Sequence, residues 1–455
     1  MKAYTRFTLP MTKFFSFLYA LGALFQLSAQ SITSEPASFY GLGEMSARGH
    51  GIFDALGKNT INVFDSSILN HYNPATYNRL SKGATLYCVS LHSRQSWYSN
   101  ANTAQFAATP MVEQFTLGFK IREQMGMSFG LRPFSARGYE ISETIFTGLD
   151  SLYYLYNGRG AIQDLYLGYS FGIIEKPHTQ LAIGANASYL FGTLTNERIS
   201  ELLTGTTNAG GLERNSLILR SFYTEIGSYF YQQLGKNHSI KLSAVYQPNL
   251  TLDANYQKEL YSSATIGVPS TFDTIQVTNE KFSAQLTESL QLGMSYAIKL
   301  PTYKRQTREL HPQLQLYASR SNFGALHQNQ DLLTGFNQKE YMRMSFGMEY
   351  QPEINVIENI ATLKGFEKIS YRLGYYQQSL PYTNNNVQYN EQAFTLGFGF
   401  PLLAQVSLSS IHVGLTFGQR SIDSGIWNEK FIGARFSIIM APSNFEKWFR
   451  KRQLD

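Results

Sequence analysis

The chain has 455 residues and a net charge of +6, and only 15% of its residues are charged whereas 14% are aromatic. Soluble domains carry roughly 25% charged residues, so this composition disfavours a protein that faces water on every side. Beyond the N-terminal region no run approaches the ~20 apolar residues of a membrane-spanning helix. A transmembrane chain without such helices must form a closed β-barrel, because the barrel pairs every backbone polar group internally.

The first residues have the layout of a secretory signal peptide. Lys2, Arg6 and Lys13 precede an apolar run over residues 14–27, and Ser28-Ala29-Gln30 offers a cleavage site. The apolar run is too short to serve as a membrane anchor. We therefore expect residues 1–30 to be a signal peptide that directs export.

Residues 31–82 differ from the rest of the chain. They contain several glycines, among them Gly41 and Gly43, and short polar stretches without long alternation. Glycine permits a tightly folded backbone, and the GK[ST] sequence of a phosphate-binding loop is absent. We expect a compact N-terminal segment that packs as a unit.

From residue 83 to residue 440, apolar residues alternate with small or polar ones. In one run Phe115, Leu117 and Phe119 alternate with Thr116 and Gly118. Strands place alternate side chains on opposite faces. The second face is rich in Gly, Ser, Thr, Tyr and Gln rather than Lys and Glu, which suits the lumen of a barrel.

The alternating runs predict an all-β antiparallel barrel of about fourteen transmembrane strands. The predicted strands cover residues 84–95, 112–122, 125–134, 161–174, 179–194, 217–234, 238–257, 282–300, 312–321, 340–352, 366–378, 391–402, 405–420 and 427–440. Long connections at 135–160, 195–216 and 258–281 alternate with short ones at 123–124, 175–178 and 235–237. Outer-membrane barrels have long external loops and short periplasmic turns. We therefore expect a multi-pass barrel of the cell outer membrane, in contact with its lipids, with both termini periplasmic and residues 441–455 as a basic periplasmic tail.

The N-terminal segment resembles a known family. Residues 39–77 combine a Gly-rich opening, including Gly41 and Gly43, with Asn73-Pro74-Ala75 just before the first strand. This arrangement is similar to the N-terminus of FadL-type outer-membrane transport proteins, whose relatives include PorV-like barrels. The C-terminal sequence NFEKWFRKRQLD resembles the tails of Bacteroidota members. The resemblance implies a fourteen-stranded barrel with residues 31–82 as a hatch that plugs the lumen.

Two functions follow from this resemblance. One is an outer-membrane channel for uptake of hydrophobic or amphipathic small molecules, such as long-chain fatty acids. The alternative is a non-transporting accessory barrel of a secretion or outer-membrane protein assembly complex, with a protein of the envelope machinery as its partner. The dispersed charge and lack of a recognition motif argue against a nucleic-acid partner.

Several basic residues fall on the predicted inner face, notably Lys120, Arg132, Arg372 and Arg435. Cations on the lipid face cost about 2–4 kcal/mol at the midplane, so inward placement is expected whatever the function. They can pair with the acidic residues of the hatch (Glu35, Glu44, Asp54 and Asp65). One or two of them can instead receive the carboxylate of an amphipathic ligand.

Catalytic signals are weak. Two GxSxG sequences, at 126–130 and 168–172, lie inside predicted strands, whereas a nucleophile elbow needs a strained strand-to-helix turn. The eight histidines are scattered without metal-ligand spacing. We expect no enzyme activity, no metal and no cofactor.

Overall fold

A computed structural model describes most of the chain. The described residues are 33, 35–39, 42–45, 49–83, 85–99, 104–148, 150–203, 208–263, 272–286, 288–303, 306–319, 336–338, 340–352, 365–384, 387–402, 409–422 and 428–441. The predicted signal peptide, Gly41 and all of the predicted tail after residue 441 lie outside them.

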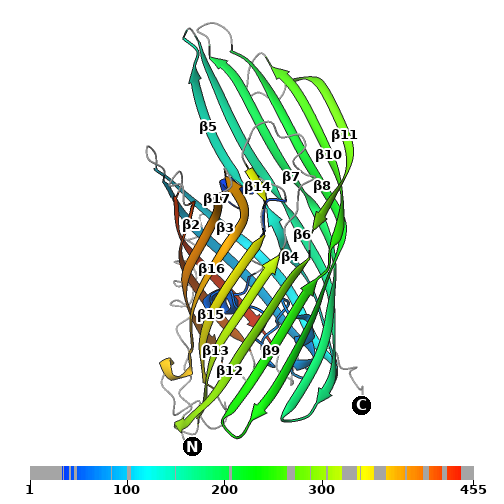
Figure 1. The fold of residues 1–455 in the computed structure, drawn as a ribbon, viewed down its shortest axis with the longest axis vertical. Helices are drawn as coiled ribbons and strands as arrows, with labels where there is room; N and C mark the ends of the chain where they lie inside the picture. Colours follow the sequence, from blue (N-terminus) through cyan, green and yellow to red (C-terminus); the bar gives the residue numbers. More distant parts are fainter. Residues whose placement is uncertain are drawn as a thin grey trace, which may run out of the picture.

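The described strands form one antiparallel sheet that closes on itself where β19 pairs with β2 (Figure 1). Their bounds are β1 (Glu44–Met45), β2 (Thr85–Ser99), β3 (Ala104–Arg122), β4 (Met125–Ala136), β5 (Tyr139–Phe146), β6 (Ser151–Glu175), β7 (Thr179–Leu203), β8 (Asn208–Leu234), β9 (His238–Gln247), β10 (Leu250–Ser263), β11 (Phe272–Leu286), β12 (Ser289–Tyr303), β13 (Gln306–Ser319), β14 (Phe336–Gln338), β15 (Tyr341–Pro352), β16 (Ser370–Asn384), β17 (Val387–Pro401), β18 (Ser410–Ile422) and β19 (Asn428–Met440).

The barrel wall has fourteen strands, which confirms the predicted fold class. Four wall strands are interrupted, because β4 and β5 both pair with β6, and β9 and β10 both pair with β8. Likewise β11 and β12 continue one another, as do β14 and β15. β1 is separate, since it pairs with β4 from the N-terminal part of the chain.

The two faces of the wall differ as the alternation predicts. On β6, Leu165 and Leu167 are each 51% exposed, whereas the neighbouring Asp164 and Tyr166 are buried. Successive strand residues point to opposite faces, so the apolar set lines the outside of the barrel and the polar set lines the lumen.

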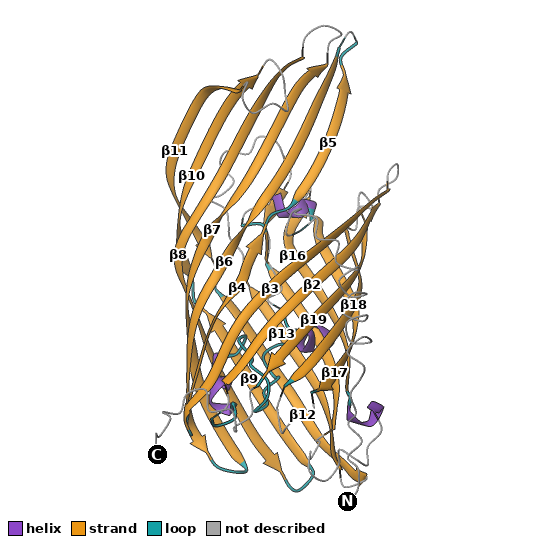
Figure 2. Cartoon of the chain, turned by 180° about the vertical axis from the view of Figure 1, so that it is seen from behind, coloured by secondary structure: helices purple, strands orange, loops and turns teal. Residues whose placement is uncertain are grey.

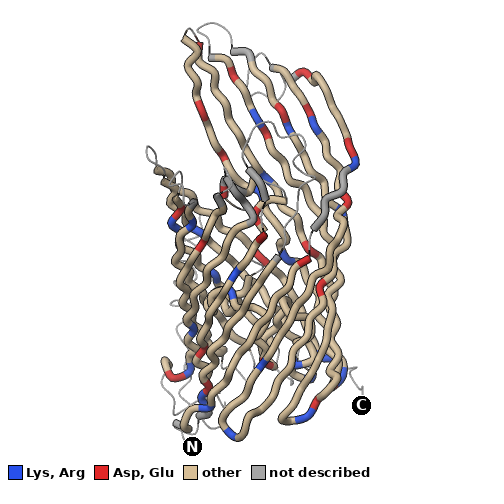
Figure 3. The backbone as a smooth tube through the Cα atoms, viewed as in Figure 1, with Lys and Arg blue, Asp and Glu red and all other residues tan. Residues whose placement is uncertain are grey.

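One side of the barrel stands higher than the other (Figures 1 and 2). We call the higher part the raised wall: β5, residues 151–160 of β6, 194–203 of β7, 208–217 of β8, β10 and β11. The prediction of long loops at 135–160, 195–216 and 258–281 is therefore wrong, because most of these residues lie in strands. Charged residues are frequent along these strands (Figure 3).

Helices are few and short among the described residues. They are η1 (Pro36–Phe39), α2 (Gly51–Ala55), η2 (Pro74–Arg79) and η5 (Gly365–Lys368). In the described part of the chain, none has the length and apolar character to cross a bilayer. Two of them, α2 and η2, contact the barrel strands from the lumen.

Candidate functional site in the barrel lumen

Residues 49–83, which we call the luminal segment, lie inside the barrel (dark blue in Figure 1). Its helix α2 packs on β16, β17, β18 and β19, and η2 packs on β3, β4, β6, β7 and β8. Ile52, Phe53 and Leu69 form a buried cluster with Leu86 and Cys88 of the wall. The single cysteine is therefore a buried packing residue.

Inward-facing glycines of the wall bring the luminal segment unusually close. A Cβ added at Gly184 would lie 2.5 Å from the backbone carbon of Pro74, and one at Gly347 would lie 2.7 Å from the Leu56 carbonyl oxygen. Real Cβ atoms essentially never come this close. Other wall glycines that meet the segment are Gly126, Gly227, Gly293, Gly374, Gly397 and Gly414. The small residues of the inner face thus provide the space that the segment fills.

Wall side chains also form hydrogen bonds with backbone N–H and carbonyl groups of the luminal segment. The Gly51 N–H donates to Ser437 Oγ at 2.8 Å, and the Thr60 N–H donates to Gln315 Oε1 at 2.6 Å. Thr395 Oγ1 accepts from the Gly57 N–H and donates to the Ala55 carbonyl, each at 3.0 Å. Buried backbone groups need such partners, so these contacts fix the path of the segment as well as its position.

The Asn73-Pro74-Ala75 triplet begins η2. The Asn73 side chain accepts from the Ala75 N–H at 3.2 Å, and Pro74 occupies the first turn. Asparagine is a favoured helix cap, and proline suits the first helical position. Asn73 also donates to the Ser228 carbonyl of β8 at 3.1 Å, which joins the cap to the wall. Gly43 is the other described residue of the predicted hatch motif, and its φ of +82° is a conformation that favours glycine.

The predicted inward arginines contact protein groups. Arg132 is fully buried, 2.7 Å from Asp164 and 2.9 Å from Glu225, and donates to the His71 carbonyl of the luminal segment at 3.0 Å. The partners of Arg132 are thus carboxylates of the wall rather than of the segment.

The other predicted cations have different surroundings. Arg435 forms ion pairs with Asp54 of α2 and with Glu113. Arg372 lies 2.6 Å from Glu349. Lys120 is only partly buried, and its backbone forms an isolated parallel β-bridge with that of Lys82. The three arginines are therefore engaged with acidic side chains, which favours structural pairing over ligand capture.

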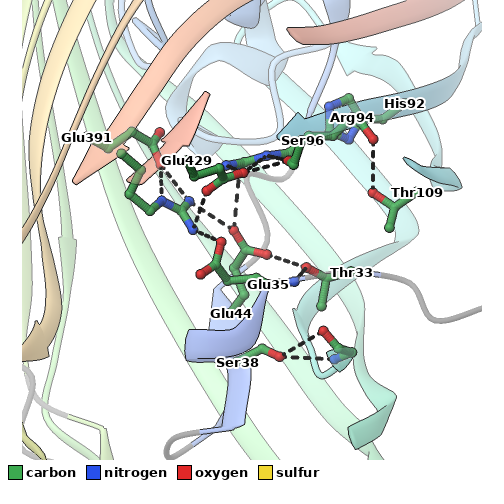
Figure 4. Close-up of polar contacts among 12 residues, drawn as sticks. Thr33, Glu35, Ser38, Glu44, His92, Arg94, Ser96, Thr109, Glu391 and Glu429 are labelled. Atoms are coloured by element: carbon green, nitrogen blue, oxygen red, sulfur yellow. Dashed lines mark hydrogen bonds and ion pairs between the residues drawn. The ribbon is translucent and has the colours of Figure 1, made fainter. Parts of the chain in front are cut away.

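The site that sequence reasoning missed lies far from the short turns, near the last residues of β2 and β18 and the first residues of β17 and β19. Figure 4 shows its contacts. Arg420 of β18 binds Glu391 at 2.5 Å, contacts Glu44 at 3.3 Å, and pairs with Glu35. Arg94 of β2 binds Glu429 at 2.6 Å. We call Glu35, Glu44, Lys58, Arg94, Glu391, Arg420 and Glu429 the upper cluster. Its arginines were not singled out because only the fold brings residues of β2, β17, β18 and β19 together around the N-terminal residues.

The upper cluster has more carboxylates than cations. Four carboxylates face Arg94, Arg420 and Lys58, and Lys58 reaches Glu391 at 3.1 Å. Burial raises the pKa of Glu35 to about 8, because a buried carboxyl group disfavours its charged form. Burial therefore favours the neutral form of Glu35, which offsets the excess negative charge of the cluster.

The GxSxG serines, Ser128 and Ser170, lie in β4 and β6. The Ser128 hydroxyl is 2.8 Å from the Tyr166 hydroxyl, inside the wall. Neither serine occupies the strand-to-helix turn that an elbow nucleophile requires. In the described part of the chain, no group of three metal-ligating side chains comes together.

Comparisons with known proteins agree with this architecture. A family model described as BamG matches residues 11–455. The Pseudomonas putida toluene transporter TodX is similar in structure, with a TM-score of 0.52 and 13% identity over 88% of this chain and 99% of that chain. A Pseudomonas aeruginosa FadL homologue has a TM-score of 0.51 and 9% identity over 88% and 99% of the respective chains. No curated protein matches the chain. At these identities the structural likeness establishes a shared FadL-like barrel fold.

Proposed function

The chain belongs to the BamG family, and we propose that it is a plugged, non-transporting barrel that serves as an accessory subunit in outer-membrane protein assembly. The family name points to envelope machinery. We place the barrel in the outer membrane because its outer face carries the apolar side chains and its inner face the polar ones.

The observation that carries the proposal is the fit of the luminal segment. Movement of the segment would separate Arg435 from Asp54 and withdraw the His71 carbonyl from Arg132. Breaking a buried ion pair costs roughly 3–5 kcal/mol. The backbone contacts at the wall glycines and the hydrogen bonds to Ser437, Gln315 and Thr395 would be lost as well. Such a segment is suited to support the barrel rather than to open and close it.

The raised wall supports a role in protein contact. Its outer face carries an ion-pair ladder in which Glu197 joins Arg159 at 2.8 Å and Arg214 at 2.7 Å, and Arg214 joins Glu259 at 3.3 Å. Charged side chains of this density do not suit lipid. We therefore place the raised wall outside the bilayer on the external side, where it presents strands to a partner protein.

The short turns then lie in the periplasm. β2 begins and β19 ends at this same end, because Tyr87 pairs with Met440. We infer that Ala441, the last described residue, lies at the periplasmic end of the barrel, which fits an even number of strands. The described N-terminal residues lie within the lumen instead, where the Thr33 hydroxyl donates a hydrogen bond to Glu44 at 2.6 Å.

The second candidate is a channel for hydrophobic or amphipathic molecules, with long-chain fatty acids as one substrate class. The fold shared with TodX, a toluene transporter, favours it. Transport would require the luminal segment to shift, which would break its contacts with Arg132, Arg435 and the wall glycines.

Depletion of the protein from its own cells separates the two functions. An accessory subunit predicts that the amounts of other outer-membrane barrels fall while uptake of toluene and oleate per cell is unchanged. A channel predicts the opposite pair of results. Gentle purification of the tagged full chain should recover envelope proteins in fixed proportion, and recovery of the barrel alone with bound hydrophobic molecules would contradict the proposal.

A further inference from the structure

A cavity of about 330 Å³ opens at the end of the barrel that carries the short turns. Its lining comes from the luminal segment, from residues 236–241 of the β8–β9 hairpin, and from β12 and β13. It is separate from the upper cluster, whose residues do not line it. We call it the short-turn cavity.

The lining is polar and has an excess of positive charge. Its cations are Arg79, Lys236, Lys241 and Lys299, and its carboxylates are Asp65 and Glu309. Hydroxyl and amide groups of Ser66, Tyr231, Asn237 and Ser239 surround them. With the histidines neutral, the lining carries two more positive than negative charges.

The cations are only partly neutralised by the carboxylates of the lining. Lys299 lies 3.9 Å from Glu309, and His311 shares that carboxylate at 3.2 Å. The Lys241 ammonium lies 4.6 Å from the centre of the Phe64 ring, where it can still donate hydrogen bonds. Arg79 lies 4.0 Å from Glu175, a distance at the outer limit for an ion pair. An anion that entered the cavity would therefore meet several donors with remaining capacity.

We propose that the short-turn cavity binds a phosphate group that carries a small polar substituent. A phosphate monoester has a charge of about −1.5 to −2 and three acceptor oxygens, which matches the excess charge of the lining. Lysine binds phosphate as a point charge without strict geometry. The volume exceeds that of bare phosphate and lies at the lower limit of small-molecule pockets, about 300 Å³.

Two sources could supply such a group. The cavity is bounded on one side by Lys236 and Asn237 of the turn between β8 and β9. With the short turns in the periplasm, as proposed above, this turn lies at the periplasmic edge of the barrel wall. A phospholipid headgroup could reach over that turn. A soluble phosphate ester of the surrounding compartment could enter through the open mouth.

The test uses the full chain in a maltoside detergent that contains no phosphate. Titration calorimetry with glycerol 1-phosphate and with inorganic phosphate should give saturable binding to one site. Lys241→Gln and Lys299→Gln should each weaken binding by roughly tenfold, the loss expected for one charge-assisted hydrogen bond. Lys82→Gln is the matched control for the loss of one lysine charge, because Lys82 is 71% exposed, pairs with Glu123 and does not line the cavity.

Native mass spectrometry of the same preparations distinguishes the sources. Retention of a phospholipid by the unaltered protein, lost in Lys299→Gln, supports a lipid headgroup. Saturable binding of glycerol 1-phosphate with no retained lipid supports a soluble ester. No saturable binding together with no retained phospholipid, an equal loss in Lys82→Gln, or binding of an acidic peptide but not of phosphate would overturn the proposal. Melting curves of the variants confirm folding, and Lys299→Gln replaces Lys241→Gln if the latter unfolds.

Discussion

At the scale of single residues, buried charges of the lumen pair with one another. Arg132 is the largest fully buried side chain among the described residues, and it contacts Asp164, Glu225 and the His71 carbonyl at once. If the guanidinium is removed, the carboxylates remain buried without a cationic partner. The free energy of unfolding then falls because of these unpaired acids as well as the lost contacts of the arginine.

We expect Arg132→Met to destabilise the barrel by about 3–5 kcal/mol, the cost of leaving buried carboxylates without a partner. Urea unfolding, followed by the change in gel migration of the unboiled protein, measures it. Arg159→Gln is the control, since Arg159 is 58% exposed in its pair with Glu197 and exposed pairs contribute about 0–1 kcal/mol. Equal effects of the two substitutions would argue against a buried network at Arg132.

A glycine of the wall offers a second residue-scale prediction. Gly184→Ala places a methyl group against the Pro74 backbone, so it should cost about 1–3 kcal/mol and loosen η2. Gly433→Ala is the matched control, because the nearest atom to its added Cβ is 3.5 Å away, an ordinary contact. Proteolysis rates within residues 49–83 report the loosening. A segment equally protected in both variants would contradict the fit proposed for the lumen.

At the scale of elements, the upper cluster joins the N-terminal residues to β17, β18 and β19. Glu35 is the carboxyl group of this cluster whose pKa is raised. The pKa of Glu35 rises on folding from 4.5 to about 8 because the group is buried. A raised carboxyl pKa means that the folded state binds more protons between these two values. The contribution of Glu35 to stability is therefore complete below pH 4.5 and is lost as the pH rises through 8.

Melting temperatures across pH 5 to 9 test this dependence. The natural protein should lose stability towards pH 9 by more than Glu35→Gln does, since glutamine keeps the neutral, hydrogen-bonding form at every pH. The difference between the two curves isolates Glu35 from other titrating groups. Parallel curves would show that Glu35 does not change its protonation in this range.

The elements also show where sequence reasoning succeeded and failed. Strands within the barrel were predictable because lipid on one side and lumen on the other impose strict alternation, as in β6 and β17. The raised wall was predicted as loops because both its faces carry charge, with Arg198 and Glu213 on one and Glu197 and Arg214 on the other. Opposite charge predicted that inward cations can pair with acidic residues of the hatch, as Arg435 does with Asp54, but no local pattern could join Glu35 to Arg420.

At the scale of the whole molecule, the raised wall continues strands of the lower barrel. In the β7–β8 register Thr195 lies opposite Ser216, and the pairing extends below this point to Thr179 and Gln232. A two-residue Asn-Gly turn can connect antiparallel strands at such a position.

We expect a chain in which Asn-Gly replaces residues 196–215 to fold and to keep its closed barrel, with heat-modified gel migration like that of the natural protein. It should lose the envelope proteins that co-purify with the natural chain, because the ion-pair ladder would be gone. The charge-reversed Arg214→Glu chain, which retains the strands, should show a partial loss. Full recovery of partners with the shortened chain would exclude the β7–β8 part of the raised wall as their contact surface.

The position of the luminal segment, in contact with strands from both ends of the chain, also bears on how the barrel folds. The Gly51 N–H meets Ser437 across a sequence separation of 386 residues, and η2 binds strands from the first half of the chain. Folding is slow when stabilising contacts join distant parts of a chain, because the intervening loop must lose entropy first. The first and last wall strands, β2 and β19, pair beside the luminal segment, which packs on Leu86 and Cys88 of β2. We therefore expect closure of the barrel to be a late step in folding, because it joins the two ends of the chain around this segment.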